Sequence, residues 1–155
     1  MLTLTQKENS LLQDEKKHEE ICIQKYDEYS NKASNPELKS LFQSLGQKEQ
    51  EHLNTINQII SGTVPNVNAQ QSTPQQQNQP AQNNLAQYSS IDKQKDEFLC
   101  TDALSTEKYV SSTYNTAIFE FKDPNIRQVL NHIQKEEQEH GEKIYNYMSQ
   151  NGMYC

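Results

Sequence analysis

The sequence predicts an all-α protein: an antiparallel four-helix bundle made of two repeated helical hairpins joined by a long crossover. Hydrophobic residues make up only 32% of the 155 residues and the mean hydropathy is −1.02. The core must therefore be narrow, as in helices that each bury one stripe. Only four residues are glycine, and the long segments rich in Glu, Lys and Gln favour helix. The second half also repeats the first at a constant offset of 88 residues.

We expect a single domain, residues 1–155, with one hairpin over residues 5–61 and the other over 90–152. In each hairpin the second helix begins at a similar step, Asn35-Pro36 or Asp123-Pro124. Asn and Asp cap helix starts, and proline suits the first helical position. The tight turns before these steps predict antiparallel helix pairs. The expected helices span about residues 5–33, 36–61, 90–122 and 124–152.

The segment between the hairpins, residues 62–89, is rich in Gln and Asn, contains three prolines, and has no charged residue or histidine. Such a segment cannot bury a core, and it is expected to be disordered or loosely draped. A flexible segment of this length typically spans roughly 30 Å. It could therefore return along the bundle as a crossover. The alternative is a plain linker between two hairpins that pair with other chains.

Each expected helix carries an apolar stripe that ionisable residues interrupt at mid-length. The interrupting residues are Glu19 in the first helix, Glu49 and His52 in the second, Glu107 in the third, and Glu137 and His140 in the fourth. At 1.5 Å per residue they all lie roughly 20–25 Å from the turn of their hairpin, so they share one layer. Carboxylates in a core are costly unless they are paired or bind a metal. A local rule broken so consistently usually marks a functional site.

These six side chains predict a metal site. Four carboxylates offer a charge of about −4, which two divalent cations would neutralise, and mixed carboxylate and imidazole ligands suit Fe, Mn or Zn more than Mg or Ca. The alternative is a buried salt-bridge network without metal, although such networks are seldom favourable relative to apolar packing.

Five further residues near these stripes need an interpretation. Tyr26 and Tyr114 each lie two turns from the isolated glutamate of their helix. They are read as core aromatics with satisfied hydroxyl groups, with a weaker alternative as redox residues beside the metals. Cys22 is read as a small buried hydrophobe. A further Glu-x-x-His match at Glu15–His18 is read as solvated helix surface, because the second half has no equivalent histidine.

The six-residue arrangement resembles the ferritin-like di-iron family, and its spacing is closest to that of rubrerythrins, over about residues 10–150. The resemblance implies bridging or chelating roles for Glu49 and Glu137, one-metal ligands at His52 and His140, and terminal ligands at Glu19 and Glu107. It also implies two divalent ions, Fe first and Mn next, and iron oxidation or the handling of peroxide or O2. Unlike rubrerythrins, the sequence has no rubredoxin-like Cys-x-x-Cys module, so peroxidase turnover would need an outside reductant.

The second half also resembles spore coat proteins of the coat F family. The matching text is DALSTEKY at 102–109, DPNIR at 123–127, and the ending that runs from Tyr147-Met148 to Asn151-Gly152-Met153-Tyr154. This resemblance implies a spore-forming bacterium and residence in or near the spore coat. Residues 1–10 lack the pattern of a signal peptide, so synthesis in the cytoplasm is expected.

Composition argues against several kinds of partner. The net charge is −7 and no stripe of Lys and Arg is present, so nucleic-acid binding is not expected. No apolar run approaches 18 residues, so no membrane span is expected. The three cysteines form no Cys-x-x-Cys pair, which favours synthesis in a reducing compartment. Cys155 is either a free terminal thiol or a cross-link to another chain.

Two functions follow from these observations. The first is a spore-coat-like di-metal oxidoreductase of ferroxidase, peroxidase or catalase type, acting on O2 or peroxide. The second is a non-enzymatic structural coat component whose bundle holds metal only as a staple or not at all. In that case contacts with other coat proteins, or self-association, would come from residues 62–89 and Cys155.

Overall fold

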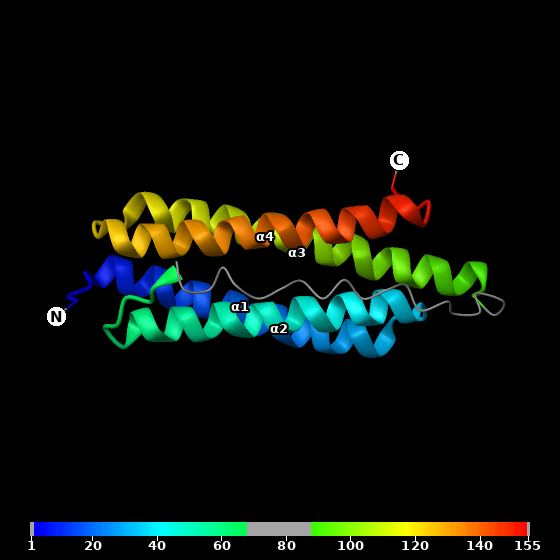
Figure 1. Ribbon diagram of the computed structural model, residues 1–155, viewed down its shortest axis with the longest axis horizontal. Helices are drawn as coiled ribbons and strands as arrows, with labels where there is room; N and C mark the ends of the chain where they lie inside the picture. The colour runs from blue at the N-terminus through cyan, green and yellow to red at the C-terminus, as the bar shows by residue number, and fades with distance from the viewer. Residues whose placement is uncertain (1, 68–87, 155) are drawn as a thin grey trace.

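The computed structural model describes residues 2–67 and 88–154. They form four α-helices, which are α1 (Gln6–Lys32), α2 (Pro36–Ile60), α3 (Ser90–Glu120) and α4 (Pro124–Gln150) (Figure 1). The prediction of an all-α bundle of two helical hairpins is confirmed, and the helix ends agree with the expected ones to within about two residues. Most of the expected crossover, residues 68–87, lies outside the described residues, as does Cys155.

The two hairpins pack on each other as two layers, with α1 and α2 in one and α3 and α4 in the other (Figure 1). Helix α1 contacts α2 and α3, whereas α4 contacts α3 and α2. Helices α2 and α3 run in the same direction (Figure 1). The end of α2 and the start of α3 therefore lie at opposite ends of the bundle, as a long crossover requires.

Side-chain caps fix where the helices begin, because the first N–H groups of a helix have no partner within it. The two caps predicted from the sequence, Asn35 and Asp123, each accept a hydrogen bond from a backbone N–H of the first turn, and proline follows both. The first helix of each hairpin also begins at a side-chain cap. Thr5 caps α1 and Ser89 caps α3, and each accepts a hydrogen bond from a backbone N–H of the first turn.

Two buried acids, which the sequence analysis did not single out, hold the hairpins together at their turns. The backbone N–H groups of Ser34 and Asn35 donate to Asp96, at 2.8 and 2.9 Å. At the opposite end of the bundle the N–H of Lys122 donates to Glu8, at 3.0 Å. Glu8 and Asp96 are themselves 88 residues apart. The repeat therefore includes a reciprocal contact, in which the first helix of each hairpin ties down the turn of the other.

The apolar core is divided into two clusters with a polar layer between them. On α2, one cluster ends at Leu45 and the other begins at Ile56, so Glu49 and His52 lie between them. Cys22 is buried, as predicted. None of the helices in the described ranges is long and apolar enough to cross a membrane.

Candidate metal centre

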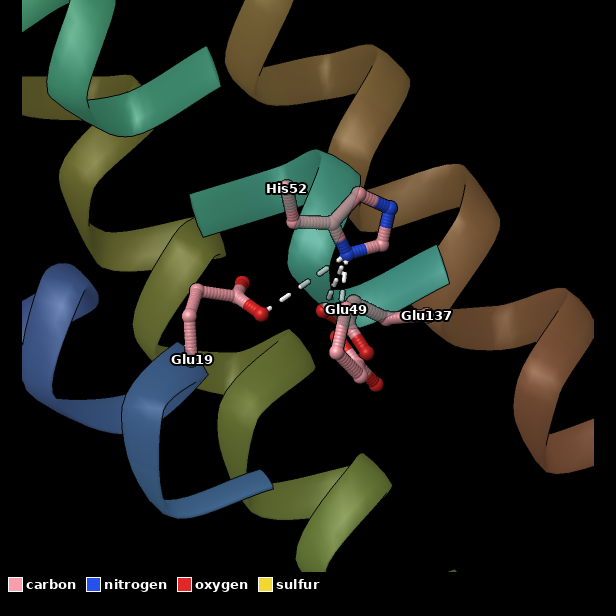
Figure 2. Close-up of side chains that lie close together, drawn as sticks. All are labelled: Glu19, Glu49, His52 and Glu137. Carbon is pink, nitrogen blue, oxygen red and sulfur yellow. Dashed lines mark hydrogen bonds and ion pairs between the residues drawn. The ribbon is translucent and has the colours of Figure 1, made fainter. Parts of the chain in front are cut away.

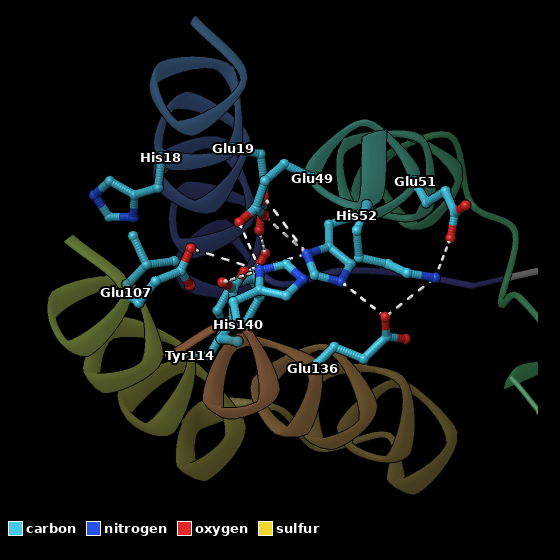
Figure 3. A network of polar contacts seen from close by, with 12 residues as sticks. His18, Glu19, Glu49, Glu51, His52, Glu107, Tyr114, Glu136 and His140 are labelled. Carbon is cyan, nitrogen blue, oxygen red and sulfur yellow. Dashed lines mark hydrogen bonds and ion pairs between the residues drawn. The ribbon is translucent and has the colours of Figure 1, made fainter. Parts of the chain in front are cut away.

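The polar layer contains all six side chains that the sequence singled out, and each is no more than 3% exposed. They come from all four helices and converge on the axis of the bundle (Figure 3). Helical spacing explains the convergence, because a glutamate and a histidine three residues apart share one helix face. The structure thus brings the six residues together, while their role as metal ligands stays a prediction.

One group of possible ligand atoms is centred on His52 (Figure 2). Its Nδ1 lies 3.0 Å from Glu49 Oε2, 3.2 Å from Glu137 Oε1 and 3.8 Å from Glu19 Oε2. The four residues offer atoms that all lie within 4.8 Å of one another. Three carboxylates and one imidazole therefore point at a common centre.

A second group is centred on His140. Its Nδ1 lies 3.0 Å from Glu49 Oε1, 3.5 Å from Glu107 Oε1 and 3.6 Å from Glu137 Oε2. These four residues also offer atoms within 4.8 Å of one another. Glu49 and Glu137 belong to both groups, and each turns one oxygen toward each histidine. The two imidazole rings are stacked, with centroids 5.6 Å apart.

The carboxylates and imidazoles fit a metal ion, because several of the buried carboxylate oxygens have no hydrogen-bond partner. Among the described residues, both carboxylate oxygens of Glu137 and one each of Glu19 and Glu107 are buried without a hydrogen-bond partner. Buried polar atoms are almost always paired, and leaving one unpaired costs about 1–3 kcal/mol. A cation would satisfy these oxygens together. Either group could therefore hold a metal ion, and mixed oxygen and nitrogen donors suit a first-row transition metal.

The metal-free cluster distributes its charge unevenly. Burial would raise the pKa of Glu49, but hydrogen bonds from His140 and His52 hold it well below its usual value. Burial would lower the pKa of His52, but the four carboxylates around its ring raise it well above its usual value. Burial raises the pKa of Glu137 well above its usual value, and Glu107 and Glu49 add to the effect. The surroundings therefore favour the charged form of Glu49 and of the two histidines, and the protonated form of Glu137.

Tyr26 and Tyr114 are buried core aromatics with satisfied hydroxyl groups, as predicted. Their partners are ligand candidates of the other hairpin. The hydroxyl of Tyr26 donates to Glu107 Oε1, and that of Tyr114 donates to Glu19 Oε1. The antiparallel pairing of α1 with α3 produces this exchange, because a residue two turns along one helix lies beside the glutamate of the other. Each tyrosine thus fixes one oxygen of a buried carboxylate.

The sequence analysis missed a residue behind His52. Its Nε2, the nitrogen that faces away from the cluster, lies 3.5 Å from Glu136 Oε2. Glu136 also pairs with His132, at 2.5 Å, and with Lys48, at 3.4 Å. A carboxylate on the far nitrogen of a ligating histidine fixes its tautomer and orientation. The only sequence signal for this network is the i, i+4 spacing of His132 and Glu136.

The interpretation of Glu15–His18 as solvated surface is wrong for Glu15, which is 2% exposed. Its Oε2 lies 3.3 Å from Nδ1 of His18, whose side chain is 21% exposed, and 3.0 Å from the hydroxyl of Thr113. Helix α3 crosses this flank of α1 and covers it. Burial raises the pKa of Glu15 to about 8 despite the hydrogen bond from Thr113.

Comparison with known proteins places the chain in a family. Residues 95–154 match the Coat F domain. The chain is also 33% identical over 79 residues to the uncharacterized protein YusN of Bacillus subtilis. The aligned region covers 51% of this chain and 72% of the relative. The chain belongs to the Coat F family. No solved structure matches it significantly.

The Coat F match covers only part of the polar cluster. Glu107, Glu137 and His140 lie within residues 95–154, on α3 and α4. Glu19, Glu49 and His52 lie on α1 and α2, before the matched region. Each candidate metal group combines residues from inside and outside the match, so the cluster depends on both hairpins.

Proposed function

We propose that this protein is a ferritin-like di-metal protein of the spore coat, holding two iron ions, or manganese ions in their place, and oxidising Fe(II) or reducing peroxide or O2. The observation that carries the proposal is the sharing of two carboxylates. Glu49 and Glu137 each face both histidines, while Glu19 and Glu107 each face only one. This distribution suits two adjacent ions, which His52 with Glu19 and His140 with Glu107 would hold, and Glu49 and Glu137 would be available to both.

The charges of the site support binding of two ions. The four carboxylates carry four negative charges once fully deprotonated, and two divalent cations would neutralise them. Metal ligands must be deprotonated, so binding would displace protons from His52, His140 and Glu137. Apolar clusters lie on both sides of the layer along the bundle.

The residues around the site would control its geometry. The two tyrosine hydroxyls donate to Oε1 of Glu19 and of Glu107. The second oxygen of each carboxylate, Oε2, has no hydrogen-bond partner and would be available to a metal ion. Two iron ions bound there would supply the two electrons that reduce one peroxide molecule to water. Regeneration of Fe(II) would need an external reductant, since Cys22 and Cys100 are buried and unpaired.

Membership of the Coat F family supports residence in the spore coat. A structural coat component whose core merely contains metal is the rival function. The two differ in redox behaviour, because a structural metal binds without turnover.

The first test is the number of metal ions per chain. The protein would be loaded anaerobically with Fe(II) or Mn(II), desalted and measured by elemental analysis. We expect two ions per chain, and a loss of metal in Glu49→Ala and Glu137→Ala. Glu139→Ala is the matched control, because Glu139 lies on the same helix as Glu137 but is exposed. No bound metal in the wild type would leave a metal-free polar core and favour the structural role.

The second test is turnover. Fe(II) oxidation by peroxide or O2 would be followed by absorbance in the wild type and in Glu49→Ala. We expect oxidation faster than that of free Fe(II) in the wild type only. Two bound ions without any acceleration would assign the metal a structural role.

A further inference from the structure

A pocket of about 600 Å³ opens in the groove between α3 and α4 and reaches the polar cluster. Glu107 and Glu137 line it, and these residues hold three of the buried carboxylate oxygens that have no hydrogen-bond partner. The inner end of the pocket therefore lies beside two ligand candidates of the second hairpin, both of which are buried.

The pocket exists because the second hairpin has small residues at two positions where the first hairpin has large apolar ones. Gly141 takes the position that Leu53 holds in the first hairpin, and Ser111 takes that of Ile23. Both Gly141 and Ser111 line the pocket. A Cβ atom added at Gly141 would meet Leu104 Cδ1 at 3.6 Å, an ordinary contact, so helix packing does not require glycine here. The loss of side-chain volume is thus local and opens the groove.

The groove between α1 and α2 differs in the described part of the first hairpin. A pocket of about 430 Å³ lies along α1 and α2, beside Ile23, but none of the six ligand candidates lines it. In that hairpin Leu53 and Ile23 are partly buried, at the positions where the second hairpin has glycine and serine. The equivalent approach to Glu19 and Glu49 is therefore filled by apolar side chains.

The C-terminal segment builds the outer wall of the pocket. Gly152, with φ +65°, ends α4 and turns the chain. Met153 is buried in the apolar core and anchors the turn. This places Tyr154 against Tyr145, with ring centroids 5.0 Å apart, and both rings line the pocket. The Gly-Met-Tyr ending, which the bundle itself does not require, thus has a role as the rim of this opening.

We propose that the α3–α4 pocket is the route by which a divalent metal cation reaches Glu107 and Glu137 from solvent. The proposal rests on the proposed function, since it needs a metal to be bound. One observation favours a cation as the occupant: the two acidic residues at the inner end of the pocket, Glu107 and Glu137, hold three buried carboxylate oxygens without hydrogen-bond partners. The exposed rim carries Glu142 and Lys108, and charges there can adjust the rate of approach.

The test compares rates of Co(II) uptake in variants that refill the groove. The chain has no tryptophan, so quenching of tyrosine emission in a stopped-flow instrument can follow uptake. We expect Gly141→Leu to slow uptake by about tenfold or more, because the ion then waits for the helices to open locally. Gly141→Ala is the matched control. It removes the same glycine from the helix but adds little volume, so its rate should stay near that of the wild type.

Ser111→Ile fills the opposite wall with the side chain found at the equivalent position and tests the route independently, should Gly141→Leu fold poorly. Equilibrium Co(II) content should stay at the wild-type level in both variants, because no ligand is changed. Wild-type uptake rates in both filled variants would overturn the route while leaving the metal site intact. A wild-type protein that binds no Co(II) would overturn the proposed function and this route together.

Discussion

The two hairpins carry the same ligand set in different surroundings. Their ligand candidates match one to one at the 88-residue offset, and so do the tyrosines that contact them. The surroundings do not match. The first hairpin has the buried Glu15 where the second has Ala103, and it has Leu53 where the second has Gly141.

The matching residues form the metal site between the two hairpins, whereas the residues that differ surround that site. Each metal group takes three residues from one hairpin and one from the other, with Glu137 completing the group of His52 and Glu49 completing that of His140. Neither hairpin holds a complete group, so metal binding and hairpin docking should stabilise each other. The ligand candidates, which act across the interface between the hairpins, are therefore the same in both repeats, whereas the residues around them differ.

The largest expected difference between the repeats is between the two shared carboxylates. In the metal-free protein, hydrogen bonds from two histidines lower the pKa of Glu49 and favour its anion, whereas burial raises the pKa of Glu137 well above its usual value and favours its protonated form. Glu49→Gln should therefore cost roughly 3–5 kcal/mol, the usual cost of breaking a buried ion pair. Glu137→Gln exchanges one neutral group for another of similar shape and should cost less than about 1 kcal/mol.

Urea unfolding in the presence of a chelator, followed by circular dichroism at pH 7, measures both variants. Equal losses of stability would show that the two carboxylates share their charge equally. In that case the symmetry of the sequence would extend to the electrostatics of the site.

The second difference is the buried Glu15 of the first hairpin. Its pKa is raised to about 8, mainly by burial. A raised acid pKa favours the folded state fully below the ordinary value near 4.5, and the contribution is lost as the pH rises through 8. Glu15→Gln removes this pH dependence. The variant should match the wild type at pH 4.5 and be roughly 3–5 kcal/mol more stable at pH 9, because each unit of pKa difference corresponds to about 1.4 kcal/mol.

Chelated protein unfolded in urea across this pH range gives the comparison. Glu20→Gln, which changes an exposed acid on the same helix, is the control and should follow the wild type. A constant stability difference between Glu15→Gln and the wild type at all pH values would contradict the prediction.

The third comparison concerns a pair that should behave alike. Tyr26→Phe and Tyr114→Phe each remove one hydrogen bond to a buried carboxylate of the opposite hairpin. Each should cost about 1–2 kcal/mol, because the carboxylate oxygen loses its partner without gaining water. Thermal unfolding of the metal-free variants tests this expectation. A cost confined to one tyrosine would mean that the repeat has also diverged at its ligands.

The sequence predicted the bundle and the convergence of the six residues because both follow from periodicity. Helical spacing fixes which residues share a face, and the offset of 88 residues fixes which face is repeated. The polar interruptions at Glu49-x-x-His52 and Glu137-x-x-His140 stand out because the rest of each stripe is mainly apolar. These parts of the structure needed no knowledge of how the hairpins pack.

The remaining features depend on packing between the hairpins, which the apolar pattern does not encode. Glu15 and Asp96 look like surface residues of an isolated helix, and only the crossing of α1 and α3 buries them. Glu136 lies beside the stripe and becomes significant only because Nε2 of His52 turns toward it. The pocket could be suspected from Gly141 opposite Leu53 in the repeat, but its depth depends on the side chains of α3.

The smallest expected difference involves one glycine in each hairpin. A Cβ atom at Gly141 would find an ordinary contact, whereas one at Gly46 would lie 3.2 Å from the Cβ of Tyr26, which is held by the backbone and cannot turn away. Alanine in place of glycine within a helix gains about 0.5–1 kcal/mol where space permits. Gly141→Ala should therefore stabilise the protein by that amount, and Gly46→Ala should lose the gain because α1 and α2 must separate. Thermal unfolding of the two variants measures both effects. Equal stabilisation would show that α1 and α2 can separate without cost, and that the close approach at Tyr26 does not position its hydroxyl for Glu107.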